Sequence, residues 1–161
     1  MRLIVYLYLL IDRIITSLRR RVRCKCYSCL FASCGTGLII DRGTLITCPK
    51  SIRIGRDVMI NYGVIIQGTD SGFSIEVGDN VVLSYRSMIL TRGINVINGM
   101  HQSVHSDADV KIGNNVWICA NAVVLPGTVV EDNVVLAAGA VAKGLLKSGH
   151  IYAGIPAKIV K

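Results

Sequence analysis

The chain of 161 residues lacks a long hydrophobic run. Residues 3–11 are all apolar, but Asp12 and Arg13 follow, so the run is far shorter than the roughly 18–20 residues that a membrane-spanning helix needs. The sequence RRRVR at 19–23 stands where a signal peptide would have its small-residue cleavage site. We therefore expect one domain with neither a spanning helix nor a cleaved leader.

A period of six residues is present instead, over residues 112–141. The segment divides into IGNNVW, ICANAV, VLPGTV, VEDNVV and LAAGAV. An aliphatic residue opens each six, and a small or β-branched residue holds the fifth place. These two places are two residues apart in neighbouring sixes, so both point to the same side of a short strand. Asn, Asp, Gly and Pro fill the turn places. The pattern predicts a solenoid of short strands.

These sixes, and the final sequence YAGIPAKIVK, resemble the hexapeptide repeat and closing motif of the left-handed β-helix acyltransferases. The resemblance covers roughly residues 36–141. It implies an all-β fold, a triangular left-handed parallel β-helix with three sixes in each turn. We expect a short N-terminal helix ahead of it from the apolar pattern of the first residues. The expected organisation is a basic, amphipathic capping segment at 1–35, a β-helix at 36–145 with an inserted loop at 95–111, and a C-terminal tail at 146–161.

The front of the chain is strongly basic. Residues 1–25 contain seven Lys and Arg against one Asp, whereas the remainder contains eleven basic and nine acidic residues. Apolar residues follow a helical stripe at positions 3, 7, 11, 14, 15, 18 and 22. Two compatible interpretations remain open. The helix caps the open end of the solenoid, or it lies on anionic lipid as a basic amphipathic segment.

The cysteines are concentrated near the front, at positions 24, 26, 29 and 34. Their spacing, C-x-C-x2-C-x4-C, differs from the spacings of structural zinc sites. We expect free or buried thiols, and a zinc site is the alternative. Cys48 and Cys119 are expected to have packing roles only.

The period of six stops at residues 95–111, NVINGMHQSVHSDADVK. A solenoid expels such extra residues as a loop, and loops of this kind commonly carry function. This loop contains His101 and His105, two of the three histidines in the chain.

The resemblance is closest to the sugar O-acetyltransferases of the maltose, galactoside and colanic-acid types. It implies transfer of an acetyl group from acetyl-CoA to a hydroxyl of a carbohydrate, such as a glycan, a capsule or a precursor. A base must take the proton of that hydroxyl, and histidine suits this role because its pKa lies near neutral pH. In these relatives a loop before an IG-x-x-VWIG segment carries the catalytic histidine, and residues 112–117 match that segment.

We therefore predict His101 as the general base, with His105 as the alternative. Many relatives have proline where Gln102 stands, which leaves the choice between the two histidines open. Asp107, Asp109 or a backbone carbonyl is expected to orient the base.

The resemblance also implies a row of cofactor contacts along the later turns, at Ala120, Ala138, Lys143 and Lys158. The alanines would let the cofactor approach backbone N–H groups, and the lysines would meet its phosphates. Asn61 and Ser87 are candidates for substrate binding, and no metal is expected. Members of the family are typically homotrimers with active sites between subunits. Trp117 is expected to pack against a neighbouring subunit.

Other activities remain open on the same fold. They are a serine acetyltransferase, whose long N-terminal helical domain this sequence lacks, and an amino-sugar N-acetyltransferase. A γ-carbonic-anhydrase type of zinc enzyme would need three converging histidines, and a non-catalytic assembly protein is a further alternative. We expect no nucleic-acid partner, a cytoplasmic location, and peripheral contact of residues 1–25 with the inner face of the membrane.

Overall fold

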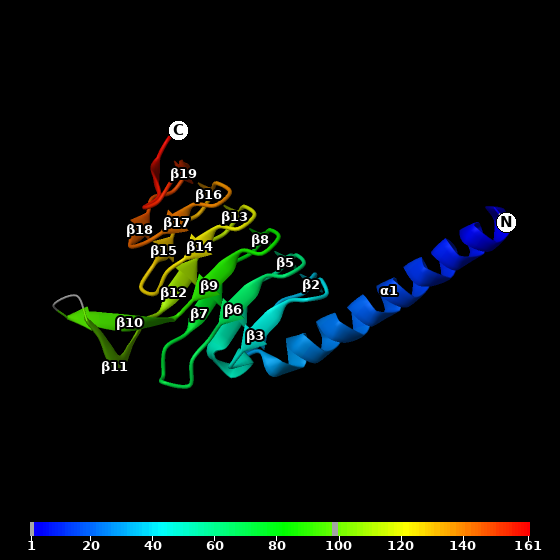
Figure 1. The fold of residues 1–161 in the computed structure, drawn as a ribbon, viewed down its shortest axis with the longest axis horizontal. Coiled ribbons are helices and arrows are strands. Elements are labelled where there is room, and N and C mark those ends of the chain that lie inside the picture. The colour runs from blue at the N-terminus through cyan, green and yellow to red at the C-terminus, as the bar shows by residue number, and fades with distance from the viewer. Residues whose placement is uncertain (1, 98–99) are drawn as a thin grey trace.

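The computed structural model describes the backbone of residues 2–97 and 100–161, and their side chains except at 2–7, 9, 95–97 and 101–104. A solenoid of short strands forms the body (Figure 1). A long helix projects from its first turn, and a strand pair projects from its side (Figure 1).

Helix α1 (Arg2–Leu30) is 29 residues long, so the expectation of a short helix was wrong. No helix in the part of the chain that the structure describes is both long enough and apolar enough to cross a membrane.

Three sheets, parallel apart from the β19–β20 pair, form the sides of the solenoid. Sheet A contains β1 (Ser33–Cys34), β4 (Ile52–Ile54), β7 (Ile75–Val77), β12 (Val110–Ile112), β15 (Val129–Val130) and β18 (Leu145–Leu146). Sheet B contains β2 (Ile39–Ile40), β5 (Met59–Ile60), β8 (Val82–Leu83), β13 (Trp117–Ile118), β16 (Val135–Leu136), β19 (Ile151–Ala153) and β20 (Lys158–Ile159). Sheet C contains β3 (Leu45–Thr47), β6 (Ile65–Gln67), β9 (Met88–Leu90), β14 (Val123–Val124) and β17 (Val141–Ala142). A short 3-10 helix, η1 (Pro49–Ser51), joins β3 to β4.

The register of these strands confirms the period of six. Lys111 pairs with Val129, 18 residues further on, so three sixes form one turn. The chain visits sheets A, B and C in rotation, and the six strands of sheet A correspond to about six turns. The architecture is the predicted all-β solenoid, consistent with a left-handed β-helix.

The predicted inward places form the core. The first and fifth places of the five regular sixes are all 3% exposed or less, at Ile112, Val116, Ile118, Ala122, Val124, Thr128, Val130, Val134, Leu136 and Ala140. All six cysteines are free, so the fold is not held by disulfide bonds. Burial of this apolar row along the solenoid is what stabilises it.

The corners of the solenoid depend on residues that accept a left-handed backbone. Asn80, Asn115 and Asn133 have φ values of 55°, 54° and 60° in successive turns. Their side chains also bond to one another, with Nδ2–Oδ1 distances of 2.9 Å from Asn80 to Asn115 and 3.2 Å from Asn115 to Asn133. Asparagine tolerates this conformation better than other side chains, which explains its recurrence at the turn places.

The interruption is a hairpin and not an irregular loop. Strands β10 (Arg92–Ile97) and β11 (Met100–Asp107) pair antiparallel. Ile75 pairs with Val110, 35 residues on, which is 17 more than one turn. The hairpin thus begins before residue 95, and residues 110–111 already belong to β12 of the solenoid.

The end of the chain closes the last turn. Strand β19 pairs parallel with β16, and β20 folds back to pair antiparallel with β19. The Tyr152 hydroxyl accepts a hydrogen bond from the Lys147 amide at 2.6 Å. The segment expected as a tail therefore contributes strands to the solenoid.

Candidate functional site

The hairpin carries both predicted histidines on β11. His101 pairs with Val96 and His105 with Ile94. The side chain of His101 lies outside the described residues, so its role remains a prediction. The side chain of His105 is exposed, and its Nδ1 lies 3.2 Å from the backbone oxygen of Gly93 on β10.

This contact assigns the tautomer of a neutral His105. A carbonyl oxygen can only accept a hydrogen bond, so Nδ1 must carry the proton. The other ring nitrogen, Nε2, then has a free lone pair that can accept a proton. The carbonyl of Gly93 thus does for His105 what a backbone carbonyl was expected to do for the catalytic base.

The two aspartates considered for this orienting role make other contacts. Asp109 Oδ1 accepts hydrogen bonds from the backbone N–H of Ser74 at 2.7 Å and from its hydroxyl at 3.1 Å. Asp107 accepts from Arg92 Nη2 at 3.3 Å and from Thr69 Oγ1 at 3.0 Å. Asp109 thus holds the backbone at Ser74, and Asp107 links the side chains of Arg92 and Thr69.

Arg92 and Asp107 form the base of the hairpin, where they are paired across β10 and β11. Arg92 Nη2 also donates to Thr69 Oγ1 at 3.0 Å and to Ser71 Oγ at 3.2 Å, and it lies 3.7 Å from Asp70 Oδ1. We call Arg92, Asp107, Thr69 and Ser71 the hairpin clamp. It fixes the hairpin to the 69–71 segment, which follows β6 in an earlier turn.

The electrostatics of the hairpin clamp favour the charged carboxylate. Burial of Asp107 raises the pKa of its carboxyl, but hydrogen bonds from Arg92, Ser71 and Thr69 outweigh burial and leave that pKa below its usual value. The hydrogen bond to Asp107 raises the pKa of Arg92. The ion pair is therefore fully formed at neutral pH. The sequence did not predict the clamp, because no motif around Arg92 indicates its distant partners.

Three of the four predicted cofactor positions gather at the corner between sheets B and C. Ala120 and Ala138 lie in consecutive turns, and the Gly139 N–H donates to the Ala120 oxygen at 2.9 Å. Lys158 is exposed and follows Ala157, whose N–H bonds to Val141 at the start of β17. Lys143 is also exposed, but it follows β17 at the opposite edge of sheet C.

The two predicted substrate residues occupy different environments. Asn61 is half-buried and its Nδ2 donates to the Leu83 oxygen at 3.1 Å, which supports the corner. Ser87 is fully buried in the solenoid interior, and its Oγ has no hydrogen-bond partner. Because Ser87 cannot reach a ligand outside the solenoid, we do not retain it as a substrate contact.

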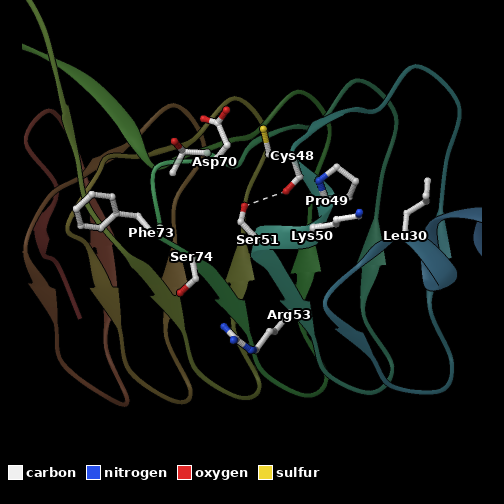
Figure 2. Close-up of a pocket in the computed structure, with 11 residues that line it drawn as sticks. Leu30, Cys48, Pro49, Lys50, Ser51, Arg53, Asp70, Phe73 and Ser74 are labelled. Carbon is white, nitrogen blue, oxygen red and sulfur yellow. Dashed lines mark hydrogen bonds between the residues drawn. The ribbon is translucent and has the colours of Figure 1, made fainter.

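Two cavities lie beside the first turns. One of about 550 Å³ is lined by residues of η1, the 69–74 segment and Leu30 of α1, including Pro49, Asp70 and Phe73 (Figure 2). The other, about 620 Å³, separates α1 from the corner between sheets B and C. Its lining includes Arg19, Arg20, Arg23, Arg42, Tyr62 and Tyr85. Sequence analysis missed this basic groove because its residues come from α1 and three separate turns.

The cysteines at the front are free. Cys24 and Cys34 are half-buried where α1 meets the first turn, and Cys26 and Cys29 are exposed. Burial, with a smaller effect of Cys24, raises the pKa of the Cys34 thiol. Among the described residues, no group of three His, Cys, Asp or Glu side chains is placed to hold a metal ion.

Comparison with known proteins agrees with this architecture. Residues 109–144 match the family "Bacterial transferase hexapeptide (six repeats)". The chain thus carries the bacterial transferase hexapeptide repeat, and the resemblance noted from the sequence is confirmed.

Individual relatives narrow the likeness to acetyltransferases. The chain is 33% identical over 112 residues to the Escherichia coli K12 protein "Putative lipopolysaccharide biosynthesis O-acetyl transferase WbbJ", which covers 70% of this chain and 50% of that protein. A maltose O-acetyltransferase from Clostridium difficile 630 is 27% identical, with a TM-score of 0.70 over 84% of this chain and 71% of that one.

A galactoside acetyltransferase solved with coenzyme A shares the fold. Its TM-score is 0.75 at 24% identity, over 84% of this chain and 66% of that one. The present chain spans about half to two thirds of the length of three curated relatives that it matches over most of its own length.

Proposed function

We propose that this protein transfers an acetyl group from acetyl-CoA to a hydroxyl of a carbohydrate. The observation that carries the proposal is the hairpin, which interrupts a transferase-type solenoid and presents two histidines on one strand. The likenesses to a maltose O-acetyltransferase and to a lipopolysaccharide biosynthesis O-acetyl transferase support a sugar as acceptor.

A histidine on β11 acts as the general base. Its Nε2 takes the proton of the acceptor hydroxyl while the oxygen attacks the carbonyl carbon of the thioester. The C–S bond breaks, the acetyl group stays on the sugar oxygen, and the thiolate of CoA leaves and takes up a proton. His101 is the first candidate from the sequence, and the bond from His105 to the Gly93 oxygen supports His105 as its alternative.

The corner between sheets B and C is proposed to hold acetyl-CoA. Ala120 and Ala138 keep side-chain bulk small in two consecutive turns, so the extended arm of the cofactor can approach the backbone there. Lys158 at the same corner is placed to meet a phosphate, as is Lys143 from the far edge of sheet C. The galactoside acetyltransferase complex with coenzyme A supports this choice of cofactor.

A homotrimer is the proposed assembly, because all three outer faces of the solenoid expose apolar side chains. Sheets B and C present Met59, Trp117, Leu45 and Met88 outward. Sheet A exposes Arg53 and Lys111, which pair with Glu76 at 3.6 and 3.7 Å. It also exposes Val129 and Leu145 in its last two strands. Apolar faces of this kind need a partner, and a neighbouring subunit would cover them and complete a cleft around the hairpin. We place the protein in the cytoplasm, where acetyl-CoA is made.

The experiment is release of free CoA thiol from acetyl-CoA with a panel of sugars, glycan precursors, amino sugars and serine. Thiol release that depends on a neutral sugar and forms an O-acetyl ester supports the proposal. Release only with amino sugars or serine would replace it by N-acetyl transfer or serine acetylation. A rate equal to background hydrolysis with every acceptor would contradict it.

A further inference from the structure

Helix α1 exposes an apolar stripe. Over its described side chains, Leu18 is 60% exposed and Ile14 is 59% exposed, and the stripe is completed by Ile11, Ile15 and Val22. These residues are spaced at three and four positions, so they lie on one face of the helix.

The stripe faces away from the solenoid. Among the described side chains of the helix, the half-buried ones are Ser17, Arg23, Cys24 and Tyr27, and the last three lie where the helix meets the solenoid. Cys24 Sγ accepts the Ile40 N–H at 3.3 Å, Arg23 donates to the Ile40 oxygen at 3.2 Å, and Tyr27 stacks on Phe31. At 100° per residue, this face lies nearly half a turn from the stripe. The last turns of α1 thus pack on the first turn of the solenoid, while the described part of the apolar stripe, from Ile11 to Val22, remains exposed.

Positive charge borders one edge of the stripe. Arg21 and Lys25 follow this edge, as their spacing from Leu18 and Val22 requires, whereas Arg19 lines the groove toward the solenoid. The helix contains one acidic residue, Asp12, and this residue lines the groove toward the solenoid. No carboxylate of α1 is therefore available to neutralise Arg21 and Lys25 at the basic edge of the stripe.

This charge pattern decides between two occupants. Packing of the stripe against α1 of a second copy would bring arginines together without acidic partners, and like charges at such seams are unfavourable. An anionic lipid surface supplies both a partner for the apolar side chains and phosphates for the basic edge.

We propose that α1 docks the protein on an anionic membrane surface. The helix lies in the interface, with the Ile11–Val22 stripe inserted among acyl chains and Arg21 and Lys25 at the level of the headgroups. The solenoid then remains on the aqueous side with its hairpin accessible. This interaction is independent of the proposed acetyl transfer.

Co-sedimentation of the full chain with vesicles tests the proposal. Phosphatidylcholine vesicles that contain phosphatidylglycerol should bind the protein, and pure phosphatidylcholine vesicles should bind it at least tenfold more weakly. Binding should weaken as salt is raised, because the charges are exposed. Equal binding to both vesicles, or to neither, would overturn the proposal.

Variants locate the interaction on the helix. Leu18→Ser should lower vesicle binding about tenfold or more, because the variant loses the hydrophobic free energy that the leucine side chain gains when it enters the membrane. Arg21→Gln should lower it about fivefold. Leu145→Ser and Lys147→Gln are matched controls, because they remove a comparably exposed leucine and an exposed lysine from the last turns of the solenoid. A loss of binding in these controls as large as in the helix variants would refute the role of α1.

Sedimentation equilibrium of the same proteins examines the competing occupant. Leu18→Ser should leave the oligomer mass unchanged. A lower mass with unchanged vesicle binding would show that the stripe is covered by another copy of the chain. Circular dichroism confirms that the variants fold, and thiol release in solution shows separately whether the enzyme activity is intact.

Discussion

The regular turns from β12 to β18 and the β10–β11 hairpin are stabilised by different interactions. The turns repeat one local arrangement, and their inward side chains are buried almost completely. The hairpin consists of two longer, antiparallel strands and projects from the body (Figure 1), with His105 and Met100 exposed. Its base depends on the few polar contacts of the hairpin clamp. A repeated core gives stability over a whole region, whereas a projecting segment can present chemistry without disturbing that core.

The hairpin histidines should give the largest effect on activity and none on stability. His101→Ala or His105→Ala, whichever removes the base, should lower acetyl transfer by about two to four orders of magnitude. Steady-state rates and thermal melts of both variants make the measurement, and each variant is the control for the other. Full activity in both would show that the base lies outside the hairpin.

Substitutions in the solenoid core should instead affect stability. Leu146→Ala removes a leucine that is 2% exposed, so it should lower the free energy of unfolding by about 2–5 kcal/mol. Leu145→Ala, the adjacent residue at 55% exposure, should change it by about 0.5 kcal/mol or less. Chemical denaturation measures both. Equal effects would mean that Leu145 is also buried, for example by a neighbouring subunit.

The hairpin clamp connects the two regions, so its loss should reduce activity more than stability. Asp107→Asn removes the charge that Arg92 contacts, and misplacement of the base should lower kcat by roughly 10- to 100-fold. Asp79→Asn breaks a comparable ion pair to Arg56, at 2.6 Å on a solenoid corner, and should leave kcat unchanged. The same loss in both variants would assign the effect to general electrostatics.

Protonation of Asp107 at low pH should remove the same carboxylate charge that Asp107→Asn removes. The pKa of Asp107 is lower in the folded protein than its ordinary value of 3.8, so its contribution to stability is present above that pH. The contribution is lost as pH falls through the lowered pKa of the folded state. Stability of the native protein should therefore depend more steeply on pH below about 3.8 than that of Asp107→Asn, as measured by thermal melts. Parallel profiles would contradict a charged Asp107 in the clamp.

Ser87→Ala should give the smallest effect, and it distinguishes a buried core residue from a substrate contact. Its hydroxyl is buried without a partner, so Ser87→Ala should stabilise the fold by about 1 kcal/mol and leave the KM for the acceptor unchanged. Ser84→Ala serves as the contrast, because Ser84 Oγ accepts a bond from Trp117 Nε1 at 2.8 Å and its loss should destabilise by about 1 kcal/mol. A raised KM in Ser87→Ala would restore it as a substrate contact.

The sequence by itself determined the repeating part of the protein. Which side chains point inward follows from a period of six, because the direction of a side chain on a short strand depends only on its neighbours. Even Ser87 obeys this rule, since it holds the fifth, inward place of LSYRSM. The row of small residues at Ala120 and Ala138 and the two histidines of the interruption were also visible as pattern.

Only the tertiary structure decided what depends on distant partners. The contact of Arg92 with Thr69 joins residues 23 positions apart, and that of Asp107 with Thr69 joins residues 38 apart. The direction of the α1 stripe was open for the same reason. A helical period shows that an apolar face exists, but the packing of Cys24 and Tyr27 on the first turn decides which way that face points. Local periodicity carries no information about such contacts, which form only when the solenoid brings separate turns together.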